Sequence, residues 1–140
     1  MMLYVEYEKT EEGFTGSLNL CGNVNGLSRL ADTLIDIGKL PAVIVLIRER
    51  NPSPYDGLLE EISIALKPDA KVYIGQEEEK MVISGSQEYL SILADNLRFL
   101  VENSISFSLN SEFYHIHIEY YPEHFYLEKE SIPLVVCCTR

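Results

Sequence analysis

The chain is poor in basic side chains, and this shortage argues against several classes of partner. Its 140 residues carry 11 Lys and Arg against 22 Asp and Glu, which gives a formal net charge of −11. Binding to DNA, RNA or an anionic membrane draws its affinity from Lys and Arg that neutralise phosphate. We therefore expect neither a nucleic-acid partner nor a membrane partner.

Long apolar runs and a cysteine framework are also missing. No apolar run approaches the ~18 residues that a membrane span needs, and the first residues lack the basic and apolar regions of a signal peptide. The three cysteines, Cys21, Cys137 and Cys138, include no C-x-x-C spacing typical of zinc or redox motifs. We expect reduced thiols in a cytoplasmic protein, with Cys137 and Cys138 on opposite faces of a terminal strand.

Familiar catalytic motifs are absent as well. The sequence contains no G-x-S-x-G, no G-x-x-x-x-G-K-[ST], no G-x-G-x-x-G that opens a helix and no H-E-x-x-H. These are the patterns that place a nucleophile, a phosphate or a zinc ion in many enzymes. We therefore expect a protein that is not an enzyme and has neither catalytic residues nor a cofactor.

What the sequence does contain is enough apolar material for a folded core. Hydrophobic residues make up 46% of the chain, and the mean hydropathy is −0.00. Intrinsic disorder needs low hydrophobicity beside high net charge, so a folded protein is expected. A chain of this length usually forms one domain, and we expect one over residues 1–140.

Two segments share a pattern that predicts an internal duplication. Both read G-x-x-x-x-L-S-x-L-A-D-x-L, the first from Gly22 and the second from Gly85. Each places apolar or small residues at the spacing of a helix that lies on a sheet. We expect helices over residues 23–38 and 86–102.

Extended segments flank both expected helices, so that each half reads strand, strand, helix, strand, strand. The expected helix N-caps are Asn23 or Asn25 in the first half and Ser86 in the second. The segments before the helices are residues 3–8, 14–21, 71–74 and 80–84. Similar segments follow each helix, and the second half has a longer connection there.

The expected fold class is α+β, a mostly antiparallel sheet with two helices packed on it, built from similar halves over residues 1–69 and 70–140. A unit of about 70 residues with one helix covers only one face of its sheet, so the halves should pair about a pseudo-twofold axis. One continuous sheet and two sheets packed through the helices both fit the sequence. Pairing within one chain and pairing across a homodimer also both fit.

The sharpest group of chemically active side chains lies in the second half. His115, His117 and Glu119 alternate along an expected strand, so they share one face while Ile116 and Ile118 point to the core. Two imidazoles and a carboxylate are a candidate set of metal ligands, and a His-Glu pair could transfer protons. A face that is solvated or that contacts a partner is the interpretation we favour.

Aromatic and acidic residues follow the same strand. Tyr120 and Tyr121 lie between Glu119 and Glu123, and His124 comes next. Tyrosine rings supply buried contact area at an interface, and carboxylates steer a basic surface toward it. Core aromatics beneath a loop are the alternative interpretation.

The first half carries a different version of this region. Its aligned positions hold Val45 and Ile47 where the second half has the two strand histidines, and Tyr55 and Asp56 lie in the segment that matches the aromatic one. Whatever the histidines do therefore belongs to the second half only.

The second half resembles immunity protein family 32 of bacterial polymorphic toxin systems, over residues of about 81–136. The resemblance rests on the helical run from Gly85 to Leu97, the segment from His115 to Pro122 and the closing run from Ser131 to Val136. It implies a small cytoplasmic α+β protein that binds and neutralises a cognate toxin, commonly a nuclease or another intracellular toxin. It implies no active-site residues.

We therefore predict an acidic cytoplasmic immunity protein that occludes a cognate toxin or another basic protein. The predicted contact residues are His115, His117, Glu119, Tyr120, Tyr121, Glu123 and His124. The alternative is a small metal-dependent enzyme that uses His115, His117 and Glu119 as ligands.

Overall fold

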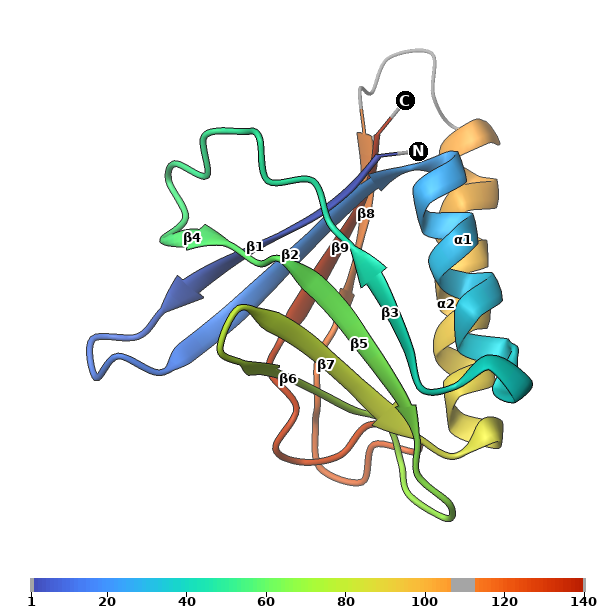
Figure 1. Cartoon of the computed structure of the whole chain (residues 1–140). Coiled ribbons are helices and arrows are strands. Elements are labelled where there is room, and N and C mark those ends of the chain that lie inside the picture. Colours follow the sequence, from blue (N-terminus) through green and yellow to red (C-terminus); the bar gives the residue numbers. More distant parts are fainter. Residues whose placement is uncertain (1, 107–112, 140) are drawn as a thin grey trace.

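The structure is a computed structural model that describes residues 2–106 and 113–139, and it contains two sheets and two α-helices (Figure 1). The strands are β1 (Leu3–Lys9), β2 (Thr15–Asn23), β3 (Ala42–Val45), β4 (Gly57–Leu58), β5 (Glu61–Leu66), β6 (Tyr73–Glu77), β7 (Lys80–Gly85), β8 (Phe113–Ile118) and β9 (Leu134–Thr139). The α-helices are α1 (Val24–Ile35) and α2 (Gln87–Ser106), and a short 3-10 helix spans Ile37–Lys39.

Each sheet combines strands from both halves of the chain. In the five-stranded sheet, β4-β1-β2-β9-β8, the hairpin β1–β2 joins the hairpin β8–β9 through a parallel pairing of β2 with β9. The four-stranded sheet, β3-β5-β7-β6, repeats this arrangement with β5 parallel to β7. The α+β fold is confirmed, as two mixed sheets paired within one chain. The duplication of the halves stays a prediction.

Buried side chains from both sheets and both helices form one hydrophobic cluster. In β5 and β7 the buried residues alternate with less buried ones, as Ile62 and Ile64 do in β5 and Met81 and Ile83 do in β7. The predicted helical stripes lie in the same cluster, at Leu27, Leu30, Ala31 and Leu34 and at Leu90, Leu93, Ala94 and Leu97. The helices lie side by side (Figure 1), and Arg98 of α2 donates to Asp32 of α1 at 2.8 Å.

The helix boundaries differ from the sequence prediction at their C-terminal ends. The first helix ends at Ile35, because Gly38 and Pro41 follow and both are poor helix formers. The second helix runs to Ser106, four residues beyond the expected end at residue 102. Its last turns are held on the sheet, since Val101 is buried and the Ser104 hydroxyl donates to Cys138 Sγ at 3.2 Å.

The alignment between the halves after the helices stays a prediction. In the structure Ile44 pairs with Ile62, and Ile118 pairs with Leu134. Val45 is the last residue of β3, so Ile47 lies beyond that strand.

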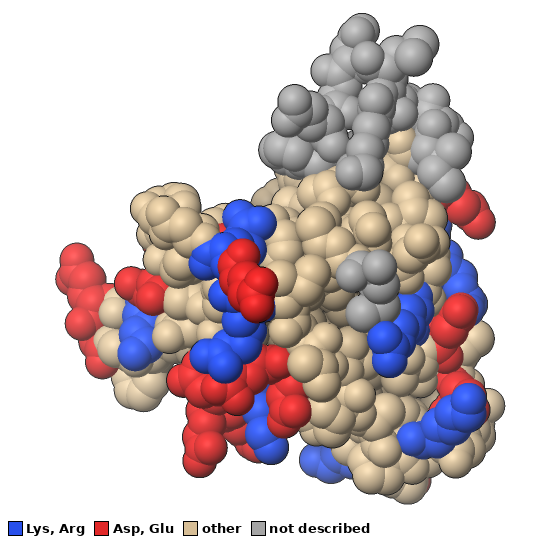
Figure 2. Space-filling view, turned by 45° about the horizontal axis from the view of Figure 1, so that its top comes forward, with Lys and Arg blue, Asp and Glu red and all other residues tan. Residues whose placement is uncertain are grey.

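Charge is unevenly distributed over the surface. Figure 2 shows acidic side chains gathered at the left and lower left of the view, beside several basic ones, while the middle of this face carries few charges. The tips of two hairpins contribute exposed acids, at Glu11 and Glu12 and at Glu78 and Glu79. Within the described residues, no helix combines the length and the apolarity that crossing a membrane requires.

Asn23, the N-cap of α1, offers a test of the local structure. Its side-chain oxygen accepts hydrogen bonds from the backbone N–H of Gly26 at 2.8 Å and of Met2 at 3.1 Å. Asn23→Ala should therefore lower the free energy of unfolding by about 1–2 kcal/mol in urea titrations. Asn25→Ala, at an exposed position of the same helix, should change it by less than about 0.5 kcal/mol. Equal losses would show that the cap is not where the structure places it.

Candidate functional site

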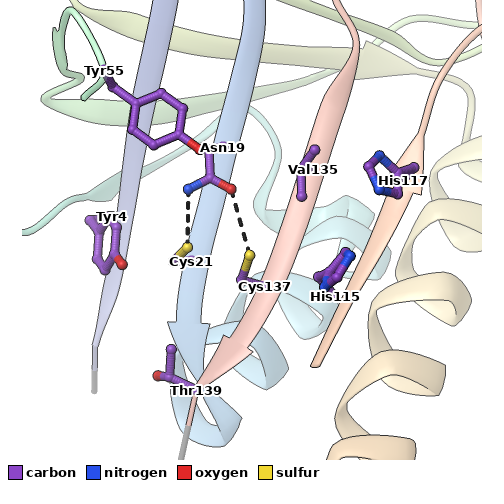
Figure 3. A pocket seen from close by; sticks show the side chains of 9 residues that line it. All are labelled: Tyr4, Asn19, Cys21, Tyr55, His115, His117, Val135, Cys137 and Thr139. Atoms are coloured by element: carbon purple, nitrogen blue, oxygen red, sulfur yellow. Dashed lines mark hydrogen bonds between the residues drawn. The ribbon is translucent and has the colours of Figure 1, made fainter. Parts of the chain in front are cut away.

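The outer face of the five-stranded sheet, which points away from the hydrophobic cluster, carries a pocket of about 360 Å³. Strands β1, β2, β9 and β8 form its floor, and the Tyr55 ring reaches toward Asn19 from the segment between β3 and β4 (Figure 3). The lining residues are Tyr4, Asn19, Cys21, Tyr55, His115, His117, Val135, Cys137 and Thr139. The pocket therefore draws on both halves of the chain.

Strand register arranges the floor of the pocket in rows. One row runs across the four strands through Tyr4, Cys21, Cys137 and His115. The next row runs through Glu6, Asn19, Val135 and His117. Residues directly opposite each other on neighbouring strands point to the same face, so the pairing of β2 with β9 is what places the two thiols side by side.

Asn19 connects the two thiols. Its Nδ2 group donates to Cys21 Sγ at 3.3 Å and to the Glu6 carboxylate at 2.9 Å, and its Oδ1 atom accepts from the Cys137 thiol at 3.6 Å (Figure 3). Contact with the Cys137 thiol lowers the pKa of Cys21 to about 7, while the same contact, together with burial, raises the pKa of Cys137. Cys21 is thus the sulfur that carries negative charge more readily.

Glu6 is a buried carboxylate whose second partner is Arg50. Only 3% of Glu6 is exposed, and an Arg50 Nη2 atom lies 3.7 Å from its Oε2 atom. The Arg50 guanidinium also lies 3.8 Å from the centroid of the Tyr4 ring. Since a buried carboxylate without a counter-charge is costly, this contact anchors the segment between β3 and β4 on the outer face of the sheet.

The histidine strand has the predicted alternation. The side chains of His115 and His117 are exposed on the outer face of β8, with ring centroids 5.5 Å apart, while Ile116 and Ile118 pack on the core. His117 Nδ1 lies 3.4 Å from a Glu119 carboxylate oxygen, and both side chains are more than half exposed. The structure therefore brings these three predicted residues together.

His124 is not part of that group. It is 5% exposed, and its Nδ1 atom accepts the backbone N–H groups of Tyr126 at 3.2 Å and Leu127 at 3.1 Å. Burial lowers its pKa, which keeps the imidazole neutral and able to accept. Its ring packs on those of Tyr120 and Tyr121, so it supports the predicted aromatic contact residues from beneath.

The metal-enzyme alternative gains no support from this geometry. Over residues 2–106 and 113–139, no three side chains of His, Cys, Asp or Glu are arranged to hold a metal ion. His115, His117 and Glu119 share a face, but a flat strand offers only neighbouring ligands to one ion.

Sequence reasoning missed half of the pocket. It noted Cys21 and Cys137 but gave no reason to place them together, and it gave no role to Tyr4, Asn19 or Arg50. Alternation along each strand could have shown which side chains point outward. The alternation of residues along a strand does not show which strand of one half lies beside which strand of the other.

A comparison with protein families bears on the second half. The family model described as Immunity protein 32 matches residues 80–139, which cover β7, α2, β8 and β9. The resemblance expected from the motifs is therefore confirmed over this part of the chain. The match covers less than half of the 140 residues.

The match divides the pocket. Strands β8 and β9, with the histidines, lie within it, whereas β1 and β2 lie outside. Neither the search of curated proteins nor the search of solved structures found a match.

Arg50 gives a test of the packing around the pocket. Arg50→Ala leaves the buried Glu6 carboxylate without its counter-charge, so the free energy of unfolding should fall by about 2–3 kcal/mol. Arg48→Ala is the matched control, because its pair with Glu60 is about half exposed and should be worth less than about 1 kcal/mol. Adding Glu6→Gln to Arg50→Ala should recover part of the loss in urea titrations. Equal effects of the two arginine variants would contradict the assigned role.

Proposed function

We propose that this protein is an immunity protein that binds a cognate toxin and neutralises it by covering its active surface. The match of residues 80–139 to the Immunity protein 32 family is the observation that supports the proposal. We further propose that contact is made by a β8 docking face, defined as His115, His117, Glu119, Tyr120, Tyr121 and Glu123.

The chemistry of the β8 docking face is that of a protein interface. Tyr121 is 56% exposed, and the side chains of His117 and Glu119 are 58% and 53% exposed. Aromatic residues are enriched in protein interfaces, where their rings supply contact area at low entropic cost. The pocket beside the strand histidines offers a concave place for a side chain of the partner.

Charge favours a basic partner. A net charge of −11 attracts positively charged proteins over distances of a Debye length and speeds their encounter. A nuclease toxin carries basic residues because it binds phosphate, so an acidic protein in the cytoplasm would be steered to the surface that must be blocked. His124 would act indirectly, by holding the tyrosines of the docking face in place.

Co-expression tests the proposed function directly. Cells that produce the basic protein encoded beside this gene should stop growing, and production of the present chain should restore growth. The two proteins should also co-purify as a stoichiometric complex. Continued growth arrest in the presence of folded protein would contradict the immunity role.

Charge reversal tests the docking face. The pair Glu119→Lys and Glu123→Lys should lower the association rate with that toxin about tenfold at low ionic strength and weaken its salt dependence, because steering is electrostatic. The matched control is Glu11→Lys with Glu12→Lys, which changes the net charge equally at the tip of the β1–β2 hairpin (Figure 1). Stopped-flow measurements in which both pairs slow association equally would place the contact elsewhere.

A further inference from the structure

Cys21 and Cys137 are paired across the parallel strands β2 and β9, and both face the pocket. All three cysteines are free, and Cys138 points the other way, into the core, with 1% exposure. Neighbouring strands lie about 4.8 Å apart, which falls within the Cα separation of about 4.4–6.8 Å that a disulfide spans. The register therefore places the two cysteines at a backbone spacing compatible with a disulfide.

The two sulfurs are held in unlike states. Asn19 donates to Cys21 and accepts from Cys137, and the Tyr4 hydroxyl also hydrogen-bonds to Cys21. These contacts favour a thiolate at Cys21 and a protonated thiol at Cys137. Thiol–disulfide exchange needs this combination, one thiolate that attacks and one thiol that resolves the mixed disulfide.

The surrounding groups do not cancel this asymmetry. Those that face the pair are Tyr4 and Glu6 on β1, His115 and His117 on β8, and Arg50 and Tyr55 from the segment between β3 and β4. The Glu6 carboxylate opposes a negative charge on Cys21, but the contact with Cys137 has the larger effect on the pKa of Cys21. Arg50 partly neutralises Glu6 in turn.

We propose that Cys21 and Cys137 form a redox-sensitive dithiol site that glutathione disulfide converts into an intramolecular disulfide. The Cys21 thiolate attacks one sulfur of glutathione disulfide, forms a Cys21–glutathione mixed disulfide and releases one glutathione thiolate, which takes up a proton. Cys137 then gives up its proton and attacks the Cys21 sulfur, which releases the second glutathione. The pair loses two electrons and two protons, glutathione disulfide becomes two molecules of glutathione, and excess glutathione reverses both steps.

The pocket gives this reaction its selectivity. It is lined by Cys21, which is 4% exposed, and by the half-buried Cys137, whereas Cys138 lies on the opposite face within the hydrophobic cluster. Oxidation should therefore stop at one disulfide and leave one thiol reduced. The site needs no toxin, so its test is independent of the proposed immunity function.

The experiment treats the folded full-length chain with glutathione disulfide, quenches it with acid and counts free thiols after denaturation. One thiol should remain, with the chain lighter by two hydrogen atoms and a peptide that links Cys21 to Cys137 in the digest. Cys138→Ala should form the same link between Cys21 and Cys137 and keep no free thiol, since Cys138 takes no part. Three remaining thiols, or a link that includes Cys138, would overturn the proposal.

Two single variants separate the attacking thiol from the resolving one. Cys137→Ser should accumulate the mixed disulfide of Cys21 with glutathione, because no second thiol resolves it. Cys21→Ser should react at least tenfold more slowly at neutral pH, since its remaining pocket thiol is protonated. Far-UV circular dichroism confirms that each variant is folded. Equal rates of glutathione addition to the two variants would contradict the assignment.

The pH profile checks the cause of the asymmetry. Alkylation of Cys21 in Cys137→Ala reports the thiolate without the Cys137 contact, so its midpoint should lie above that of the wild-type chain, which is expected at pH of about 7. Tyr4→Phe should lower the wild-type rate at neutral pH about threefold by removing one donor to the thiolate. Tyr73→Phe, on β6 of the four-stranded sheet, is the control and should leave the rate unchanged. A wild-type midpoint near the ordinary value of about 8.5 would refute an activated thiolate.

Discussion

The parallel pairing of β2 with β9 joins strands that lie near opposite ends of the chain, and the outer face of the five-stranded sheet depends on its register. Strands of a parallel pair cannot be linked by a tight turn, so each must be positioned by its own antiparallel hairpin partner. A shift of one residue would turn every side chain of β9 to the other face. Cys137 would then enter the core, and the rows that form the pocket would be lost.

A second constraint is the burial of polar groups beneath the segment between β3 and β4. Glu6 and Asn19 are buried on the outer face of the five-stranded sheet, and Arg50 pairs with Glu6 there. Among the described residues, every buried side-chain nitrogen and oxygen has a hydrogen-bond partner. A polar network in which every group is paired fixes the positions of its members. The loss of one partner would leave another buried charge or amide without a hydrogen bond, which is costly in a low dielectric. The pocket is therefore shaped before any partner arrives.

The sequence predicted the features that depend on local periodicity. The two helices, their apolar stripes and the alternation of His115 and His117 follow from residues close together in the chain, and the family resemblance came from the same local motifs. It did not predict contacts between distant segments. His124 reads as one more polar residue after a strand, and only the folded loop shows that it accepts two backbone N–H groups from within the core. For the same reason, the sequence did not predict that Cys21 and Cys137 lie side by side.

The distribution of strands from both halves over two sheets also affects how the chain folds during its synthesis. The four-stranded sheet draws on residues up to β7, so its pairings can form early, whereas the five-stranded sheet is incomplete until β8 and β9 have been synthesised. During translation, the edge of β2 that pairs with β9 therefore stays unpaired while the more than one hundred residues between these two strands are synthesised. Once synthesised, β9 pairs with β2 and completes the five-stranded sheet, and a chain that stops short of β9 would expose an apolar strand edge to its neighbours.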